Sequence, residues 1–362
     1  MSFPTDLKSI QERVLAINPK KYGTSRNHKS GAVTRLGPYI ARGVISTRMV
    51  FQHILDLDLP YFHSVKLIQE LAWRDYWQQV WIVKGNAIDS DLKHEQSAVS
   101  NHAVPTALIQ ARTGIEAIDI AIQELYNTGY MHNHMRMYIA SIACNIGHSH
   151  WFQPAQWMYA NLLDGDWASN ALSWQWVAGA NANKKYYANQ ENINNFFESD
   201  QSDTFLDVSY EQFETMETPS ILKVTENFEL KTELPTNKNL VLNAQLPTCV
   251  YSYYNLDPKW RQDETANRVL ILEPSFFTKY PVAQKPLDFA LSLSGNIEDI
   301  QVFVGEFDEL QKLAGTSTMI FKEHPTNLHF EGIQDERDWM FSVKGFFPSF
   351  FAFWKKCNKE LK

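Results

Sequence analysis

The spacing of apolar residues changes along this chain, and that change is the strongest constraint on its fold. Up to about residue 195, apolar residues recur at intervals of three and four, which is typical of helices that bury one face. The clearest such runs are Val65–Ile82, Ile115–Tyr126, Met135–Ile146 and Ala155–Leu163. Glycine and proline separate these runs. We therefore predict an all-helical domain over residues 1–197.

The second half of the chain has a different pattern. Residues 198–239 are polar and acidic, which predicts a linker or a loosely packed connection. From residue 240, short β-rich runs alternate with helical patterns, and such alternation favours parallel strand pairing. Residues 240–362 are expected to form a small α/β domain, so the fold class is α plus α/β. The predicted strands are Leu240–Asn243, Val250–Tyr254, Arg268–Leu272, Ile300–Val304 and Thr318–Phe321, and the predicted helices are Lys285–Ser294, Phe307–Leu313 and the tail Phe346–Lys362.

The formal net charge of −8 argues weakly against a general nucleic-acid binder, but the charge is unevenly placed. Residues 1–200 hold 17 basic and 17 acidic side chains, whereas residues 201–362 hold 16 and 24, so the whole deficit lies in the second part. The first 48 residues contain 9 basic and 2 acidic side chains. Such a basic segment either faces phosphates or forms a solvated surface.

The sequence indicates neither a metal centre nor a membrane span. The three cysteines are far apart, and no Cys/His cluster has metal-ligand spacing. The N-terminal segment is polar, and no apolar run reaches 18 residues. Because sparse cysteines suit a reducing compartment, we expect a cytoplasmic protein without a metal. The glycine-rich signatures of dinucleotide and P-loop sites are also absent.

One run, Leu162–Gly179, places two carboxylates around a glycine and follows them with an amide and two indole rings. Taken alone, this pattern also fits a turn whose aspartates cap a helix. The side chains of interest in this run are Asp164, Asp166, Asn170, Trp174 and Trp176.

Three further blocks combine polar and aromatic residues. In one block, Glu70, Trp73 and Arg74 stand at i, i+3 and i+4 and converge on one face of a helix. In another, Asn133 and Met137 share a helical face. The other residues of interest are Arg136 beside that face, and Tyr22, Thr34, Arg35, Leu36 and Gly37 in or before a polar turn.

In this order, the four blocks resemble the FAD-binding helical domain of DNA photolyases and cryptochromes. Members of that family show a TSRLSPYL-like loop, an ELxWREF-like helix, a TGWMHNRxRM-like helix and an LxDGDxAxNxxxWQW-like segment. Matching blocks occupy residues 22–180 here, about half of the chain. The resemblance implies FAD as the cofactor.

The same resemblance implies a role for each cofactor residue. The loop at Val33–Tyr39 would face the phosphates with backbone N–H groups and the side chains of Thr34 and Arg35. Asp166 would accept from the flavin ring, and Asn170 would face flavin N5. Arg74 and Arg136 would supply positive charge, with Asp164 pairing Arg136. The implied cofactor residues are Tyr22, Thr34, Arg35, Leu36, Gly37, Glu70, Arg74, Asn133, Arg136, Asp164, Asp166 and Asn170.

The activity that the resemblance implies is light-driven repair of UV-damaged DNA, in which reduced FAD splits cyclobutane pyrimidine dimers by electron transfer. Glu70 and Asn133 would bond the dimer. Trp73 and Trp176 would pack against it, with Met137 lining the pocket.

An electron chain is implied as well. Trp174 and Trp151 match its first two tryptophans, but the third position, near Ala98, has none. The chain would then end in another aromatic residue, for which Tyr138, Trp157 and Tyr159 are the candidates.

Several departures from the family pattern keep other functions open. His134 replaces an arginine that usually touches DNA phosphate, Leu67 replaces a cavity tryptophan, and Lys184 and Lys185 stand where other phosphate contacts are lost. An α/β segment follows the helical domain, whereas ordinary photolyases begin with one that often holds an antenna pigment. The alternatives are a blue-light sensor that signals through a partner, and a flavoprotein that only binds nucleic acid or a partner. The preference for single- or double-stranded DNA, an antenna and the oligomeric state stay open.

Overall fold

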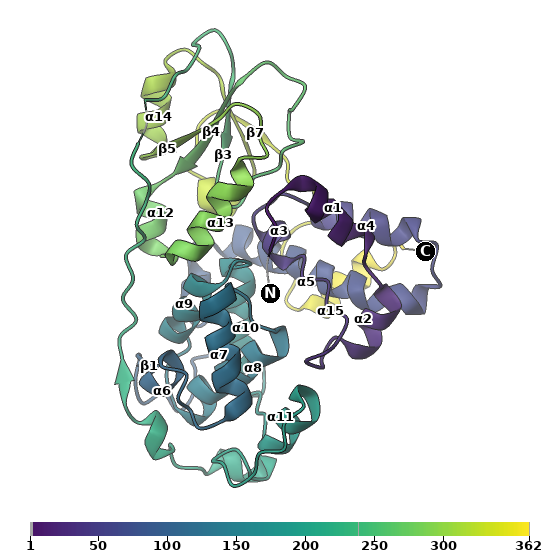
Figure 1. Ribbon diagram of the computed structural model, residues 1–362, viewed down its shortest axis with the longest axis vertical. Helices are drawn as coiled ribbons and strands as arrows, with labels where there is room; N and C mark the ends of the chain where they lie inside the picture. The colour runs from purple at the N-terminus through teal and green to yellow at the C-terminus, as the bar shows by residue number, and fades with distance from the viewer. Residues whose placement is uncertain (1–2, 238, 362) are drawn as a thin grey trace. The chain divides into compact units, whose positions relative to one another are not determined.

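The computed structural model describes residues 3–237 and 239–361. Within them the chain is mostly helical and holds a five-stranded parallel sheet (Figure 1). By packing, the chain forms two compact units: unit 1 contains residues 20–33 and 84–229, and unit 2 contains residues 3–19, 34–83, 230–237 and 239–361. The division into these two units is based on contacts between residues. The boundaries predicted at residues 197 and 240 are based on composition, and they stay a prediction.

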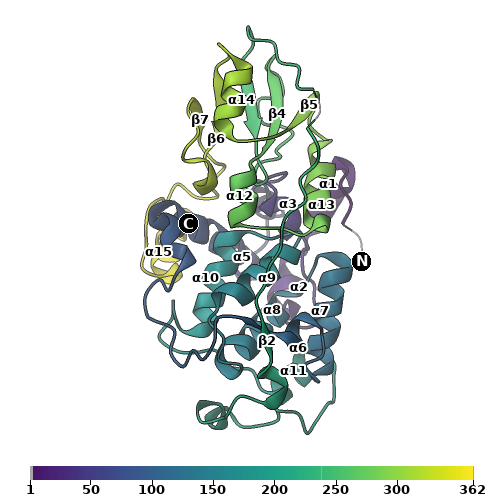
Figure 2. The same cartoon turned by 90° about the vertical axis from the view of Figure 1, so that its left-hand side faces the viewer.

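Unit 1 is helical, and both α8 and α9 pack on α10 (Figure 2). The helical runs predicted between Ile115 and Leu163 are confirmed. The elements of unit 1 are α2 (Pro19–Ser25), η1 (Gly85–Asp89), β1 (Val104–Pro105), α6 (Thr106–Ile109), α7 (Glu116–Thr128), α8 (Asn133–Ser141), η2 (Ile142–Ile146), α9 (Phe152–Asn161), α10 (Trp167–Ala178), α11 (Gln190–Phe197), η3 (Tyr210–Glu214), η4 (Ser220–Leu222) and β2 (Thr225–Glu226).

Local chemistry sets the ends of these helices. α7 ends at Gly129, which has φ +71°, a left-handed conformation that glycine adopts without strain. η2 continues α8 as a π-helical turn, in which the Gly147 N–H donates to the Ile142 carbonyl at 2.7 Å. The Asn145 side chain in this turn donates to the carbonyls of Val177 (3.0 Å) and Tyr186 (2.8 Å). The turn is thereby tied to the last turn of α10.

Unit 2 contains a helical part built around α5 (Tyr61–Lys84), which confirms the run predicted at Val65–Ile82. Its other helices are α1 (Leu7–Leu15), α3 (Gly37–Ala41), α4 (Thr47–Asp56) and α15 (Phe350–Cys357), the last of which lies within the predicted C-terminal tail helix.

Buried polar groups of α5 bond to the C-terminal segment. Asp75 accepts from the Met340 N–H (2.9 Å), and Gln79 accepts from the Gly345 N–H (2.9 Å). α5 is therefore held by residues that lie far from it in the sequence.

The sheet of unit 2 has the strand order β5-β4-β3-β6-β7, with all neighbours parallel. β3, the first strand of this sheet along the chain, lies in the middle of the sheet, as in doubly wound folds. The elements are β3 (Thr248–Tyr251), β4 (Asn267–Leu272), α12 (Pro274–Lys279), α13 (Gln284–Ser294), β5 (Ile300–Val304), α14 (Phe307–Ala314), β6 (Met319–Lys322), η5 (Pro325–Asn327) and β7 (Ile333–Asp335).

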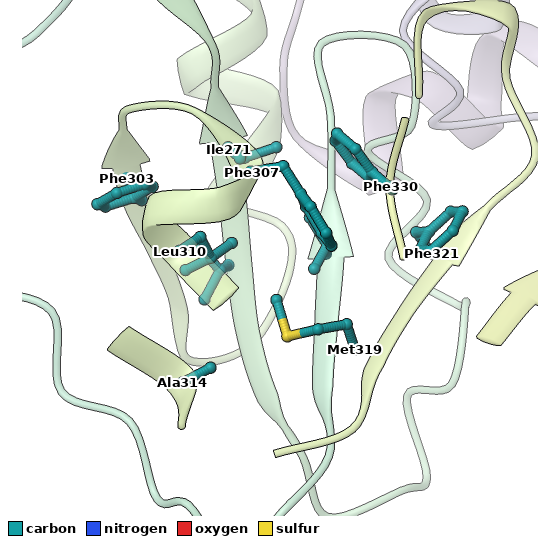
Figure 3. Close-up of a cluster of buried hydrophobic side chains, with 10 residues drawn as sticks. Ile271, Phe303, Phe307, Leu310, Ala314, Met319, Phe321 and Phe330 are labelled. Atoms are coloured by element: carbon teal, nitrogen blue, oxygen red, sulfur yellow. The ribbon is translucent and has the colours of Figure 1, made fainter. Parts of the chain in front are cut away.

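A buried apolar cluster joins α14 to the sheet (Figure 3). Phe307 of α14 stacks on Phe330 with ring centroids 4.2 Å apart, while Leu310 and Ala314 face the strands one and two turns later. Apolar residues at this spacing bury one helical face, which is why the predicted helix Phe307–Leu313 is confirmed by α14.

Two strand predictions need correction. Residues 240–243 form no strand, because the Gln301 side chain bonds both the N–H and the carbonyl of Val241 (2.8 Å each). Side-chain bonds thus take the place of a backbone ladder, although Leu240 and Leu242 still pack on the core. β7 was not predicted, since three residues are too few to show a period of two.

None of the helices in residues 3–237 and 239–361 combines the length and the apolarity that a bilayer crossing requires. The same residues contain no group of three or more His, Cys, Asp or Glu side chains placed to hold a metal ion.

Candidate functional site

The residues predicted for cofactor and substrate fall into two groups, and each group is described by itself. Unit 1 holds Tyr22, Asn133, Arg136, Met137, Trp151, Asp164, Asp166, Asn170, Trp174 and Trp176, and unit 2 holds Thr34, Arg35, Leu36, Gly37, Glu70, Trp73 and Arg74.

Arg136 and Asp164 form an ion pair in unit 1. The Arg136 Nη2 donates to both carboxylate oxygens of Asp164, at 2.9 and 3.1 Å, and its Nε donates to the Met131 carbonyl at 3.0 Å. The two side chains are 20% and 10% exposed, so water screens the pair only in part. A fixed, partly desolvated guanidinium of this kind stabilises negative charge that develops near it.

Asp166 caps α10. Its Oδ1 accepts from the Ser169 N–H at 2.8 Å, as the capping interpretation predicts. The residue is only 4% exposed. The buried Ser169 hydroxyl has no hydrogen-bond partner among the described residues. The start of α10 thus contains one carboxylate and one hydroxyl that are both withdrawn from water.

Three predicted residues lie along α10. Asn170 donates through Nδ2 to the Ala155 carbonyl (2.8 Å), which orients its amide. Trp174, one turn later, is buried at 2% exposure. Trp176 is 40% exposed, and its ring centroid lies 5.9 Å from that of Tyr186. The two indoles therefore differ: Trp174 is positioned inside the protein, whereas Trp176 presents a ring to solvent.

The start of α8 carries the other residues of this group. Asn133 is exposed at the first helical position, and Met137 is half-buried one turn on. His134 stacks on Tyr138 with centroids 4.9 Å apart, and its Nδ1 lies 3.1 Å from the Asn27 carbonyl. Burial lowers the pKa of His134 below its ordinary value of 6.5. A neutral imidazole at neutral pH does not replace the charge of an arginine.

α5 carries the predicted residues of unit 2 that lie on a helix. The Arg74 Nη1 is buried and has no hydrogen-bond partner among the described residues. The Trp73 ring stacks on Phe350 of α15, with centroids 3.8 Å apart and planes 10° from parallel. One face of the predicted substrate-facing indole is therefore covered by the C-terminal helix, which the sequence did not indicate.

The predicted phosphate loop precedes α3. Arg35 has φ +55°, a left-handed conformation that is uncommon for residues other than glycine. The Leu36 N–H lies 3.4 Å from the Thr34 Oγ1, and the Leu36 side chain is buried. The loop is thus a tight turn leading into Gly37, the first residue of α3.

Comparison with known proteins assigns the middle of the chain to a protein family. Residues 67–238 match the family model described as the FAD binding domain of DNA photolyase. This segment belongs to the photolyase/cryptochrome family.

Relatives of this photolyase/cryptochrome domain share it only in part. The deoxyribodipyrimidine photo-lyase of Alkalihalophilus pseudofirmus is 29% identical over 154 residues, and that of Streptomyces griseus is 32% identical over 153. These matches cover 40% and 41% of this chain, and 31% and 32% of those proteins. The chain therefore spans about a third of the length of the curated relatives that it matches.

A solved structure agrees with the family assignment. The crystal structure of a Synechocystis sp. PCC6803 cryptochrome matches with a TM-score of 0.51 and 25% identity, over 54% of this chain and 44% of that chain. The photolyase-like fold is thus matched in about half of the chain.

The residues present fit FAD, the cofactor named for this domain. FAD offers phosphate oxygens and a flat ring with both donors and acceptors. In unit 1, the buried Ser169 hydroxyl has no hydrogen-bond partner among the described residues, although buried polar groups are rarely left unpaired in proteins. This hydroxyl and the Arg136 guanidinium of the same unit are donors that suit an anionic, hydrogen-bonding ligand. In unit 2, taken by itself, the buried Arg74 Nη1 is a further donor without a partner in the part of the chain that the structure describes.

One group of residues was missed by the sequence reasoning. Asp89, Asp91, His102 and His150 line a cavity of about 450 Å³ in unit 1. The two imidazoles stack with centroids 4.9 Å apart. Asp91 and His150 lie 59 positions apart in the sequence, so no local spacing signal could have joined them.

Proposed function

We propose that this chain binds FAD and uses it to split cyclobutane pyrimidine dimers in UV-damaged DNA with light. The observation that carries the proposal is the match of residues 67–238 to the FAD binding domain of DNA photolyase. When bound, reduced FAD supplies the chemistry, because light makes it an electron donor to the dimer, which opens and returns the electron.

The residues of this chain would bind and orient the two ligands. Arg74 and Arg136 would hold positive charge beside the flavin, with Asp164 keeping the Arg136 guanidinium in place. Asp166 would accept from the ring, and the amide of Asn170 would face N5 in the orientation that its bond to Ala155 favours. Tyr22 and the turn Thr34–Gly37 would contact the phosphates.

The pyrimidine dimer would be held by a second set of side chains. Glu70 and Asn133 would bond the dimer, Trp176 and Trp73 would pack against it, and Met137 would line the pocket. A dimer must leave the duplex to reach such residues, and this costs least where pairing is already weakened. The 40% exposure of Trp176 supports a role in stacking on a flipped base.

A direct test is photorepair. Purified protein with chemically reduced flavin is mixed with oligothymidylate that contains dimers and is illuminated with near-UV or blue light. Recovery of thymine absorbance is the expected result. Bound, reduced flavin without recovery would refute the repair proposal.

The Glu70→Ala variant tests the assignment of the substrate group. It should slow repair at least about tenfold while retaining FAD, because a hydrogen bond to the dimer is lost in the reacting complex. Glu95→Ala, at an exposed position outside both groups, is the matched control. Equal loss of flavin and repair in Glu70→Ala would mean that Glu70 serves the cofactor instead.

One observation favours a second candidate, a blue-light sensor that signals through a partner. Phe350 covers one face of Trp73, so α15 occupies a position beside a predicted substrate residue. A sensor would show light-dependent exposure of α15 to protease and no photorepair. Photorepair with α15 protected in both light and dark would exclude it.

A further inference from the structure

A cavity of about 450 Å³ in unit 1 is lined by two aspartates whose carboxylates bond buried tryptophans. Asp89 and Asp91 lie on its wall together with the stacked pair His102 and His150. His102 and Ser90, which also line the cavity, are exposed, so solvent reaches this space. None of these residues has a role in the function proposed above.

Asp91 is the centre of this wall. Its Oδ1 accepts from the indole Nε1 of Trp151 at 2.7 Å and lies 3.2 Å from the His150 Nε2. Its Oδ2 accepts from the Gln96 N–H at 2.7 Å. Both carboxylate oxygens are therefore fixed by donors, and one of them is aimed at the indole N–H.

Trp151 is held rigidly at this carboxylate. The residue is fully buried, and its backbone N–H donates to the Gln96 Oε1 at 2.9 Å. The Gln96 Nε2 in turn donates to the Ser149 carbonyl at 2.9 Å. Because the backbone and the ring of Trp151 are both anchored, the indole Nε1 stays at hydrogen-bond distance from the Asp91 carboxylate. No rearrangement is needed before a proton can move between them.

His150 supports the ionised form of Asp91. Its Nδ1 accepts from the Phe152 N–H at 3.3 Å, which leaves Nε2 as the protonated nitrogen that donates to Asp91. Burial lowers the pKa of His150 below its ordinary value of 6.5, so the ring is neutral at neutral pH and faces Asp91 with the N–H of Nε2.

The hydrogen bond between the Trp151 indole and the Asp91 carboxylate suits the chemistry of an oxidised indole. Removing an electron from a tryptophan makes its N–H strongly acidic, and an unpaired positive charge is costly in a buried site. Transfer of the proton to a carboxylate already at hydrogen-bond distance removes both charges. The reverse electron transfer then slows, because it must recover the proton as well.

We propose that Trp151 is the terminal tryptophan of light-driven cofactor reduction and that Asp91 accepts its indole proton. This inference rests on the flavin-binding part of the function proposed above. In the step, Trp151 loses one electron through Trp174 to the oxidised cofactor, and its Nε1–H bond breaks. The proton forms an O–H bond on Asp91, which leaves a neutral tryptophan radical and a neutral acid. A thiol in solution then returns one hydrogen atom to the indole and becomes a thiyl radical, and Asp91 releases its proton to the cavity.

Trp157, the indole among the candidates for the end of the chain, has no carboxylate at its N–H among the described residues. The Trp157 Nε1 donates to the Tyr126 hydroxyl at 2.8 Å, a neutral phenol whose pKa burial raises to about 12. The Trp167 Nε1 donates to Asp89 Oδ1 at 2.7 Å, on the same cavity wall. Asp89 therefore offers a matched control: it has the same charge and the same type of bond but a different tryptophan.

Transient absorption of the full-length protein loaded with oxidised FAD tests the proposal, because tryptophan radical cations and neutral radicals absorb at different wavelengths. In Asp91→Asn, conversion of the cation to the neutral radical should slow at least about tenfold, the scale of a positioned proton acceptor. In Asp89→Asn it should remain as in the wild type. Equal slowing in both variants, or in Asp89→Asn alone, would overturn the assignment.

Two further measurements keep the test independent of folding defects in one variant. In the unaltered protein, deprotonation should be slower in D₂O, because the transferred proton exchanges with solvent. Trp151→Phe preserves ring packing and should remove the neutral radical signal. A wild-type conversion without an isotope effect, or a signal that survives Trp151→Phe, would contradict the proposal.

Repair and this inference can fail separately. After chemical reduction of the cofactor, electron supply through Trp151 is bypassed, so Asp91→Asn should repair dimers at the wild-type rate. Wild-type protein that forms the Trp151 radical but never repairs would refute the repair function alone. Repair that is lost in Asp91→Asn after chemical reduction would count against the inference.

Discussion

The stack between Trp73 and Phe350 makes a sharp prediction about stability. Phe350 is 3% exposed, and its ring lies flat on Trp73 at a centroid distance of 3.8 Å. Replacing a buried phenylalanine by alanine costs about 3–5 kcal/mol, because the transfer free energy and the cavity both count. We expect Phe350→Ala to lower the free energy of unfolding of unit 2 by about that amount.

Two matched variants separate the sources of this effect. Phe350→Leu retains most of the volume and loses the aromatic stack, which is worth about 1 kcal/mol. Phe351→Ala removes the same atoms from the next position, where the ring is 70% exposed, and should change stability by less than about 0.5 kcal/mol.

The assay is urea unfolding followed by tryptophan fluorescence and circular dichroism. Phe350→Ala should also shift the native emission to longer wavelength, because water reaches the Trp73 ring. Equal midpoints for Phe350→Ala and Phe351→Ala would refute the reasoning, since burial and stacking would then contribute nothing measurable.

Two further predictions concern charged groups. Asp164→Asn leaves the partly buried Arg136 guanidinium with a weaker partner and should cost about 2 kcal/mol in unfolding free energy together with FAD affinity, measured by urea unfolding and flavin fluorescence; unchanged affinity would remove the pair from the cofactor site. His324 is buried, and burial, aided by Arg337 and Arg42, lowers its pKa well below 6.5. Only the unfolded state then gains a proton below 6.5, so the wild type should lose about 1.4 kcal/mol more than His324→Asn between pH 7.5 and 5.5 in pH-dependent unfolding, and parallel curves would contradict this.

Local patterns in the sequence sufficed for the helical runs that were predicted and for most of the predicted strands. The run Ile115–Tyr126 shows a helical period and is followed by Gly129, so both α7 and its end were predictable. The run Leu240–Asn243 was wrongly predicted as a strand because its apolar residues do alternate in the structure: Leu240 and Leu242 pack on the core. Whether such a run joins a ladder depends on its neighbour, and here Gln301 bonds Val241 through its side chain.

The candidate site was predictable where its residues share a helix or a motif. The bond between Arg136 and Asp164 was expected from the family resemblance, and the structure contains it. The functions of these residues remain predictions. The contacts of Trp151 with Asp91 and of Trp73 with Phe350 were not predictable, because they join distant segments through packing alone.

The bonds between α5 and the C-terminal segment also set an order of events during synthesis. The ribosome releases α5 long before Met340 and Gly345, whose N–H groups meet Asp75 and Gln79. Nascent α5 must therefore keep these polar groups in water, and its apolar face is open to chaperones until residues 340–345 emerge. A chain that stops before Met340 should therefore leave Asp75 and Gln79 without these partners, and we expect it to be degraded faster than a chain that includes them.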